Sequence, residues 1–242
     1  MGTPARFPFG ITTAAKQETL GFFGLPDPTK WHVFFDDFVR FAAAEWTITT
    51  TEAGASSATE ALGDAAGGVL VVTNDAADND ADFFQKVGES FLMAAGKKTI
   101  FKARFKVSDA TQSDLVMGLQ ITDTTPLAAS GAGTTDGIFF QKDDGDANLD
   151  FYVQKNTTTG QLAETAFATI ADDTYLTLGF AYDGRKTVHL FKDDSLVASV
   201  DLTSTPTDYL PDTELTVSFG IQNGEAVAKI LTIDYIFAAQ ER

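Results

Sequence analysis

The stretch IFKARFKV (residues 100–107) decides the fold, because its side chains alternate strictly between two kinds. One set is Phe101, Ala103, Phe105 and Val107, and the other is Ile100, Lys102, Arg104 and Lys106. Successive side chains of a β-strand point to opposite faces of its sheet. The stretch therefore predicts a strand with one face in a hydrophobic core and the other face in water.

Similar short segments recur from residue 68 onward, separated by turn residues. Thirteen of them are predicted as strands: 69–73, 83–87, 90–94, 99–107, 115–122, 137–142, 149–155, 165–170, 175–182, 187–192, 195–202, 215–222 and 228–237. Long alternating helical patterns are absent from the sequence, which disfavours a parallel α/β sheet with its crossover helices. We predict an all-β fold, an antiparallel β-sandwich of the jelly-roll type, with residues 31–242 as a single domain.

Turn residues between these segments predict hairpins. The sequence Asp-Asp-Gly-Asp at 143–146 lies between two predicted strands, and Asp183-Gly184 lies between two more. Asn223-Gly224 precedes the last strand, and residues 192–195 close a further short hairpin. The strands are therefore expected to be mostly antiparallel.

Composition narrows the classes of partner. The chain has 242 residues, a formal net charge of −17, no cysteine and 21 phenylalanines. Phenylalanine in this number can fill a large core without disulfide bonds. The negative charge repels nucleic acid and anionic lipid, and no apolar run is long enough to span a bilayer. We expect neither nucleic acid nor a membrane as a partner.

The first thirty residues differ from the rest, because prolines and glycines alternate there with large apolar side chains. Regular secondary structure cannot persist through such a segment. Its apolar side chains need a surface to lie on. We predict that residues 1–30 form an extended arm ordered by a partner or neighbouring subunit, with packing on the parent sandwich as the alternative.

Two segments between the arm and residue 68 are less regular. Residues 31–46 (WHVFFDDFVRFAAAEW) fit either a short helix or a strand. The run from residue 47 to residue 68 is small and polar, which predicts the end of a strand followed by a loop.

The sequence offers little metal chemistry. With two histidines and no cysteine, most zinc sites are excluded. Residues 78–82 (DNDAD) and 144–150 (DGDANLD) resemble the start of a calcium loop, but neither run has glycine at the sixth position. Both are interpreted as solvated acidic turns, and no metal or cofactor is expected.

Catalytic motifs are also lacking. Glycosidases need two carboxylates across a cleft, and the best candidates are Asp36, Asp37 and Glu45 near Trp46. We interpret these residues as structural, because carboxylates beside aromatic residues in an acidic protein more often have that role. The sequence also shows neither a nucleophile elbow nor a phosphate-binding loop. The prediction is a protein without enzymatic activity, and glycan hydrolysis is kept as the weakest alternative.

A lectin-like role is an open alternative, because sugars stack on aromatic rings and bond to Asp and Asn in loops at the edge of a sandwich. The candidates for glycan contact are Tyr152, Tyr182 and Asp183. Tyr209 beside Asp208 offers the same chemistry.

The opening ARFPFGITTAAKQETLGFFGLPDPTKWHVFFDDF and the ending LTIDYIFAAQER resemble a group of tailed-bacteriophage virion proteins known as capsid decoration, or cement, proteins. The distinctive sequence covers about residues 6–38, whereas the likeness in architecture covers the whole chain. The resemblance implies a concanavalin-like, lectin-like jelly-roll body on the outside of the head and arms that reach over neighbouring capsid subunits. It implies these anchors: Arg6, Phe7, Pro8, Phe9, Phe22, Phe23, Leu25 and Pro26.

The resemblance also sets the expected function and partners. It predicts a non-enzymatic virion protein that binds the major capsid protein and stabilises the head lattice, with the arm as the main contact. It further predicts self-association, with a trimer favoured over a dimer or monomer, and a place on the capsid exterior after assembly in the host cytoplasm. The alternative is a carbohydrate-binding fibre or adhesion module of the same kind of particle.

Overall fold

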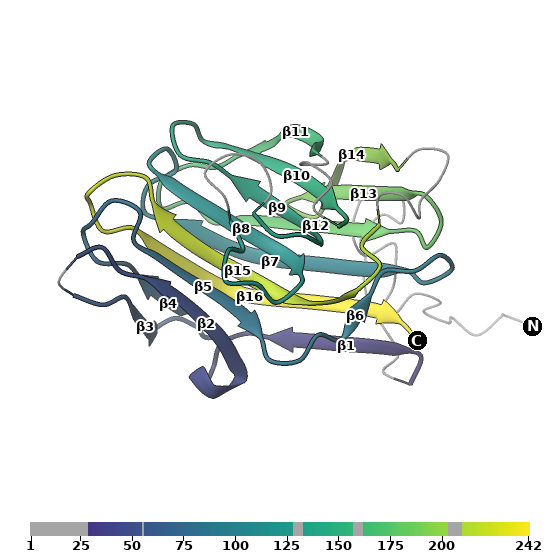
Figure 1. Cartoon of the computed structure of the whole chain (residues 1–242), viewed down its shortest axis with the longest axis horizontal. Coiled ribbons are helices and arrows are strands. Elements are labelled where there is room, and N and C mark those ends of the chain that lie inside the picture. The colour runs from purple at the N-terminus through teal and green to yellow at the C-terminus, as the bar shows by residue number, and fades with distance from the viewer. Residues whose placement is uncertain (1–28, 55, 128–132, 157–161, 203–209) are drawn as a thin grey trace, which may run out of the picture.

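A computed structural model describes residues 29–54, 56–127, 133–156, 162–202 and 210–242. Two eight-stranded sheets face each other as a β-sandwich, and every strand pair in them is antiparallel (Figure 1). The described residues contain one helical element, the 3-10 helix η2 (Ala43–Glu45), and no helix long and apolar enough to cross a bilayer. The predicted all-β, antiparallel sandwich is confirmed.

The first sheet, here called the β7 sheet, contains the segment on which the fold prediction rests. In spatial order its strands are β14 (Ser195–Asp201), β13 (Thr187–Lys192), β12 (Leu176–Tyr182), β7 (Thr99–Val107), β16 (Ile230–Glu241), β4 (Leu70–Thr73) and β3 (Thr59–Leu62), and β1 (Trp31–Asp36) also pairs with β16.

The second sheet, here called the β8 sheet, covers the other side of the core. In spatial order its strands are β11 (Leu162–Thr169), β10 (Asn148–Gln154), β9 (Gly137–Lys142), β8 (Ser113–Gln120), β15 (Glu214–Asn223), β5 (Ala81–Lys86) and β2 (Trp46–Thr51), and β6 (Phe91–Leu92) also pairs with β15. Each of the thirteen predicted segments contains one of the observed strands or most of it.

Aromatic rings from both sheets fill the space between them. Phe84 and Phe219 stack with ring centroids 4.8 Å apart, and Trp46 meets Phe219 edge-on at 5.1 Å. Elsewhere in the same core Phe101 stacks on Phe180 at 5.5 Å. Because burial of one such side chain stabilises a fold by roughly 1.5–3 kcal/mol, the aromatic core is the main source of stability.

The two faces of β7 differ, as the alternation predicts, but the outer face is not fully in water. Phe101 and Phe105 are buried in the core, and Lys102 is half-buried on the outer face. Ile100 is buried on that outer face by Phe191 and its neighbours. The prediction of a wet face is therefore wrong for Ile100, because a small second apolar cluster covers it.

The two less regular segments, residues 31–46 and 47–68, form strands that pair with neighbouring strands of the sheets. Residues 31–46 hold β1, the 3-10 helix and the start of β2, so the strand alternative is confirmed at the N-terminal side. The run from residue 47 continues β2 as expected. It then forms β3, so the prediction of a loop is wrong for these four residues. The short segment TEAL has little strand propensity, and pairing with β4 places it in the sheet.

Three of the four predicted turns close hairpins. Residues 143–146 join β9 to β10, Asp183-Gly184 joins β12 to β13, and Asp193-Asp194 joins β13 to β14 with both residues at positive φ. The prediction is wrong at Asn223-Gly224. That turn carries the chain from β15 in one sheet to β16 in the other, so its two flanking strands do not pair.

A carboxyl pair links the two sheets near one edge. Asp82 of β5 is fully buried, accepts a hydrogen bond from the Thr50 hydroxyl at 2.6 Å, and faces Glu60 of β3. Burial, and then the charges of Glu60 and Glu52, raise the pKa of Asp82 to about 7. The interpretation of residues 78–82 as a solvated turn is therefore wrong for Asp82 and for Asp80, which is also buried.

We expect Asp82→Asn to stabilise the protein at pH 8 and to leave it nearly unchanged at pH 4. The folded chain holds the Asp82 proton more tightly than the unfolded chain, so stability is lost as the pH rises from about 4 to about 7. An amide cannot ionise, and the gain at pH 8 should be about 2–4 kcal/mol. Denaturant unfolding at both pH values measures it, with the exposed Asp64→Asn as the control. A variant less stable than the wild type at pH 8 would contradict this account.

Candidate functional site

A depression of about 280 Å³, here called the polar depression, lies where several loops meet at one end of the β8 sheet. Its lining consists of Asp78, Asn79, Asp114, Leu127, Asp144, Gln222 and Gly224. These residues come from the β4–β5 turn, the start of β8, the β9–β10 turn, the end of β15 and the segment after β8. Except for one leucine and one glycine, every lining residue has a side chain that can form hydrogen bonds.

The side chains of the polar depression hold one another in place. Asp114 is buried and accepts a hydrogen bond from the backbone N–H of Asp144 at 2.6 Å. Burial raises the pKa of Asp114 to about 6. Asn79 has a left-handed backbone with φ 65°, and its N–H donates to the carbonyl of Asn223 at 3.0 Å. The amide of Gln222 lies 3.4 Å from the side-chain oxygen of Asn79.

Gly224 allows two turns to approach each other closely. A Cβ atom at this position would lie 2.4 Å from the Cβ of Asp144, which is far inside van der Waals contact. The N–H of Gly224 donates to the carbonyl of Gln112, and the N–H of Gly145 donates to the carbonyl of Thr111. The β7–β8, β9–β10 and β15–β16 turns are thereby joined through their backbones.

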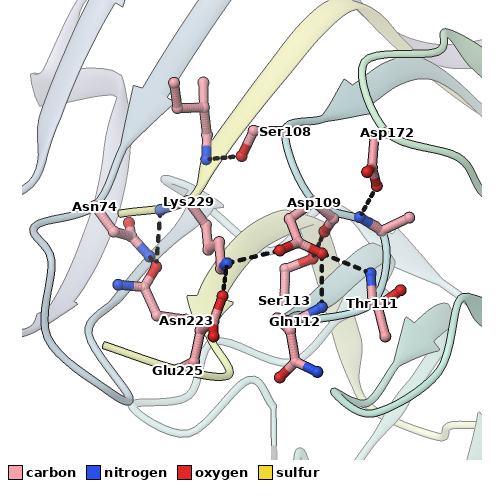
Figure 2. Close-up of polar contacts among 12 residues, drawn as sticks. Asn74, Ser108, Asp109, Thr111, Gln112, Ser113, Asp172, Asn223, Glu225 and Lys229 are labelled. Carbon is pink, nitrogen blue, oxygen red and sulfur yellow. Dashed lines mark hydrogen bonds and ion pairs between the residues drawn. The ribbon is translucent and has the colours of Figure 1, made fainter. Parts of the chain in front are cut away.

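The buried Lys229 joins two of these loops, the one after β7 and the one after β15. The side chain of Lys229 is buried, and its ammonium lies 2.8 Å from Asp109 and 2.6 Å from Glu225 (Figure 2). Asp109 in turn accepts the backbone N–H groups of Thr111 and Gln112, each at 2.9 Å. This network fixes the loop after β7 to the loop after β15.

Asn223 connects a further loop to the network. Its side-chain oxygen accepts hydrogen bonds from the Asn74 amide and from the Lys229 N–H, each at 3.2 Å (Figure 2). Its side-chain amide donates to the carbonyls of Asp75 at 2.6 Å and Ala77 at 2.9 Å. The β4–β5 turn that carries Asp78 and Asn79 is therefore held before any ligand binds.

Most of the side chains that line the polar depression can form hydrogen bonds with a ligand. Carboxylates accept hydrogen bonds, while the amides of Asn79 and Gln222 both donate and accept them. Among the described residues no group of three or more His, Cys, Asp and Glu side chains is arranged to hold a metal ion. The sequence drew attention to Asp78, Asn79 and Asp144 only as parts of calcium-like runs or a turn, and it gave no signal for Asp114 or Gln222.

The predicted glycan-contact residues have structural roles in the fold. Tyr152 is buried and stacks on Phe139 with ring centroids 5.6 Å apart. Tyr182 is buried in the main core, where its hydroxyl donates to the Arg185 carbonyl at 3.0 Å. Burial raises the pKa of each tyrosine to about 12. Because a sugar stacks on an exposed ring face, their positions do not support glycan contact.

Asp183 caps a turn, and several other predicted residues fall outside the described part. The Asp183 carboxylate accepts three backbone N–H groups within the β12–β13 turn, at 2.7, 2.9 and 3.1 Å. Asp208 and Tyr209 lie outside the described residues. The same is true of the predicted arm contacts: Arg6, Phe7, Pro8, Phe9, Phe22, Phe23, Leu25 and Pro26.

The carboxylates considered for glycan hydrolysis do come together. Asp36, Asp37, Glu45 and Trp46 help to line a second depression of about 350 Å³, here called the aromatic depression. Lys86 lies 2.6 Å from Glu45, and its hydrogen bond lowers the pKa of that carboxyl. Trp46 is buried, with the Lys86 ammonium 5.4 Å from its ring. The aromatic depression therefore offers no free tryptophan face to a sugar.

Comparison with known proteins identifies the fold. No protein-family model matches the chain, and no curated protein matches it. Peanut lectin is 10% identical with a TM-score of 0.60, covering 87% of this chain and 97% of the lectin. An endo-1,3-β-glucanase from Streptomyces sioyaensis is 14% identical with a TM-score of 0.60, covering 90% and 99%. A Shewanella oneidensis protein of unknown function is 14% identical with a TM-score of 0.58, covering 90% and 95%.

These similarities show the fold alone, a lectin-like and glucanase-like jelly-roll sandwich. The jelly-roll prediction is confirmed. The likeness to capsid decoration proteins stays a prediction, because the names of these three structures do not mention that role.

We expect Lys229→Met to lower the free energy of unfolding by about 1–3 kcal/mol, because it removes a buried ammonium that bonds to two carboxylates. Lys186→Met is the matched control, since Lys186 pairs with Asp201 at 2.7 Å on the exposed surface and its loss should cost much less than that of Lys229. Denaturant unfolding of both variants makes the comparison. Equal losses would show that the loop network does not depend on Lys229.

Proposed function

We propose that this chain is a carbohydrate-binding, lectin-like module, and that its binding site is the polar depression. The observation that carries the proposal is the set of polar side chains from separate loops, held in position by the Lys229 and Asn223 networks. The fold shared with peanut lectin and an endo-1,3-β-glucanase supports the choice of ligand class.

The chemistry of the lining suits a sugar. Each sugar hydroxyl both donates and accepts hydrogen bonds, and carboxylates beside amides satisfy both roles. Leu127 supplies an apolar contact for the C–H groups of a sugar ring. Binding to a site already held in shape loses little conformational entropy, which favours affinity.

Charge restricts the kind of sugar. Asp78, Asp114 and Asp144 surround the polar depression, and the chain as a whole carries a charge of −17. Uronic and sialic acids would be repelled by these carboxylates. We therefore propose a neutral or amino sugar as the ligand, bound without cleavage.

The Asn79→Gly variant tests the site with little effect on the backbone. Glycine adopts the left-handed φ of Asn79 without strain, so only the amide side chain is lost. We expect affinity for glycans that the wild type binds on an array to fall by about ten-fold or more, as for a lost hydrogen bond in a polar site. Calorimetry with the best neutral glycan gives the magnitude.

Two aspartates of one turn supply the matched control. Asp144 lines the polar depression, whereas Asp146 does not and bonds to the N–H of Asn148 instead. We expect Asp144→Ala to lose binding and Asp146→Ala to retain it, although both remove one negative charge. A wild-type protein that binds no neutral or amino glycan would overturn the proposal.

A second candidate function is capsid decoration, with residues 1–30 as the main contact to a major capsid protein on the exterior of a virion. The loop that follows β1 favours a protein partner, because Val39 is 66% exposed there and the Arg40 side chain is 85% exposed. An exposed apolar residue beside an exposed arginine is typical of a protein contact. Repeated sites on a shell would add avidity.

Removal of residues 1–28 tests this second candidate. We expect the shortened protein to keep the β-sheet circular dichroism of the sandwich and to lose addition to isolated phage heads, as followed by co-sedimentation. Saturation of the heads by the shortened protein would exclude the arm as the main contact.

A further inference from the structure

The strand β1 has one edge without a partner among the described residues. It pairs with β16 from Trp31 opposite Glu241 to Asp36 opposite Ile236, with no shift of register. On its other side the described part of the chain provides no strand. A strand in this position presents a row of backbone N–H and C=O groups to whatever lies beside it.

The register shows which groups point outward. The N–H of Arg242 donates to the carbonyl of Lys30 at 2.9 Å, so residue 30 occupies a hydrogen-bonded position against β16. Hydrogen-bonded positions alternate along an antiparallel pair. The N–H and C=O groups of Trp31, Val33 and Phe35 therefore point away from β16, toward the open edge.

This edge lacks the usual protection against pairing. Natural edge strands carry charges, prolines or bulges that prevent association. Residues 31–35 read WHVFF, with no Lys, Asp, Glu or Pro, and Phe35 and Val33 are 58% and 37% exposed. At the opposite edge of the same sheet, the pairing of β14 with β13 has a shift of register between Leu190 and Phe191 of β13.

We propose that a second copy of this chain binds here, β1 against β1, in antiparallel pairing about a twofold axis at Val33. The seven residues from Lys30 to Asp36 are self-complementary in this arrangement. Trp31 lies opposite Phe35 of the second copy, and Lys30 lies opposite Asp36 of the second copy. All three outward-facing residues then form hydrogen-bonded pairs, and the two β7 sheets become one.

Charge selects this register over its neighbours. A shift by two residues in one direction places Lys30 opposite Phe34 of the second copy, and a shift in the other direction places it opposite the buried Phe38. Only the register centred on Val33 pairs opposite charges at both ends of the strand. Each copy carries a charge of −17, which opposes unspecific association and leaves the matched edge as the contact.

Substitution at the twofold axis tests the dimer in the full-length protein. Val33→Lys places two ammonium groups opposite each other, and we expect the dissociation constant from sedimentation equilibrium to rise by at least about ten-fold. Val197→Lys is the matched control, because Val197 is 53% exposed on β14 at the other edge of the sheet. The wild type and the control should both have the mass of two chains.

A cysteine cross-link gives a second readout that does not depend on how well the lysine variant folds. The chain has no cysteine, so Val33→Cys introduces a single thiol, and paired strands bring two such residues within disulfide reach. Mild oxidation should yield a covalent dimer from Val33→Cys and none from Val197→Cys. A wild-type mass of one or three chains, or a Val33→Cys protein that stays uncrosslinked, would overturn the proposal.

Discussion

The stacking of aromatic side chains between the two sheets is the constraint on which the rest of the molecule depends. The chain has no disulfide, so burial of apolar side chains, and no covalent cross-link, is what holds the two sheets face to face. Phe84, Phe219 and Trp46 join β2, β5 and β15 within one sheet, while Phe180, which stacks on Phe101 of its own sheet, meets Phe140 of the opposite sheet. Any loop that carries function is positioned by strands that this core holds in register.

Two kinds of polar interaction are built on that frame, with opposite consequences. The Lys229 and Asn223 networks pair the buried Lys229 ammonium and the Asn223 amide with several partners around one set of loops, which makes those loops rigid. The Asp82–Glu60 pair, in contrast, places two acids together near a sheet edge, and the pKa of Asp82 is raised there. The loops at one end of the β8 sheet are thus fixed relative to one another, while a contact between the two sheets depends on the pH.

The sequence predicts the strands far better than it predicts the site. Period-two alternation identifies β7 from its own residues, because burial on one face of a sheet leaves a local pattern. It does not show whether the outer face is covered, so the burial of Tyr152 beside Phe139 was missed. Asn223-Gly224 has the composition of a hairpin but connects different sheets. The polar depression joins Asp78, Asp114, Asp144 and Gln222, whose proximity only the topology creates.

The pairing of β1 with β16 has a consequence for protein engineering. The N–H of Arg242 bonds to the carbonyl of Lys30, so the first and last residues of the sandwich are neighbours in space. A short linker could join them, and new chain ends could be opened in an exposed turn such as that of Asp193-Asp194. Circular permutation or insertion into a host loop would then leave every strand of both sheets in its present order in space.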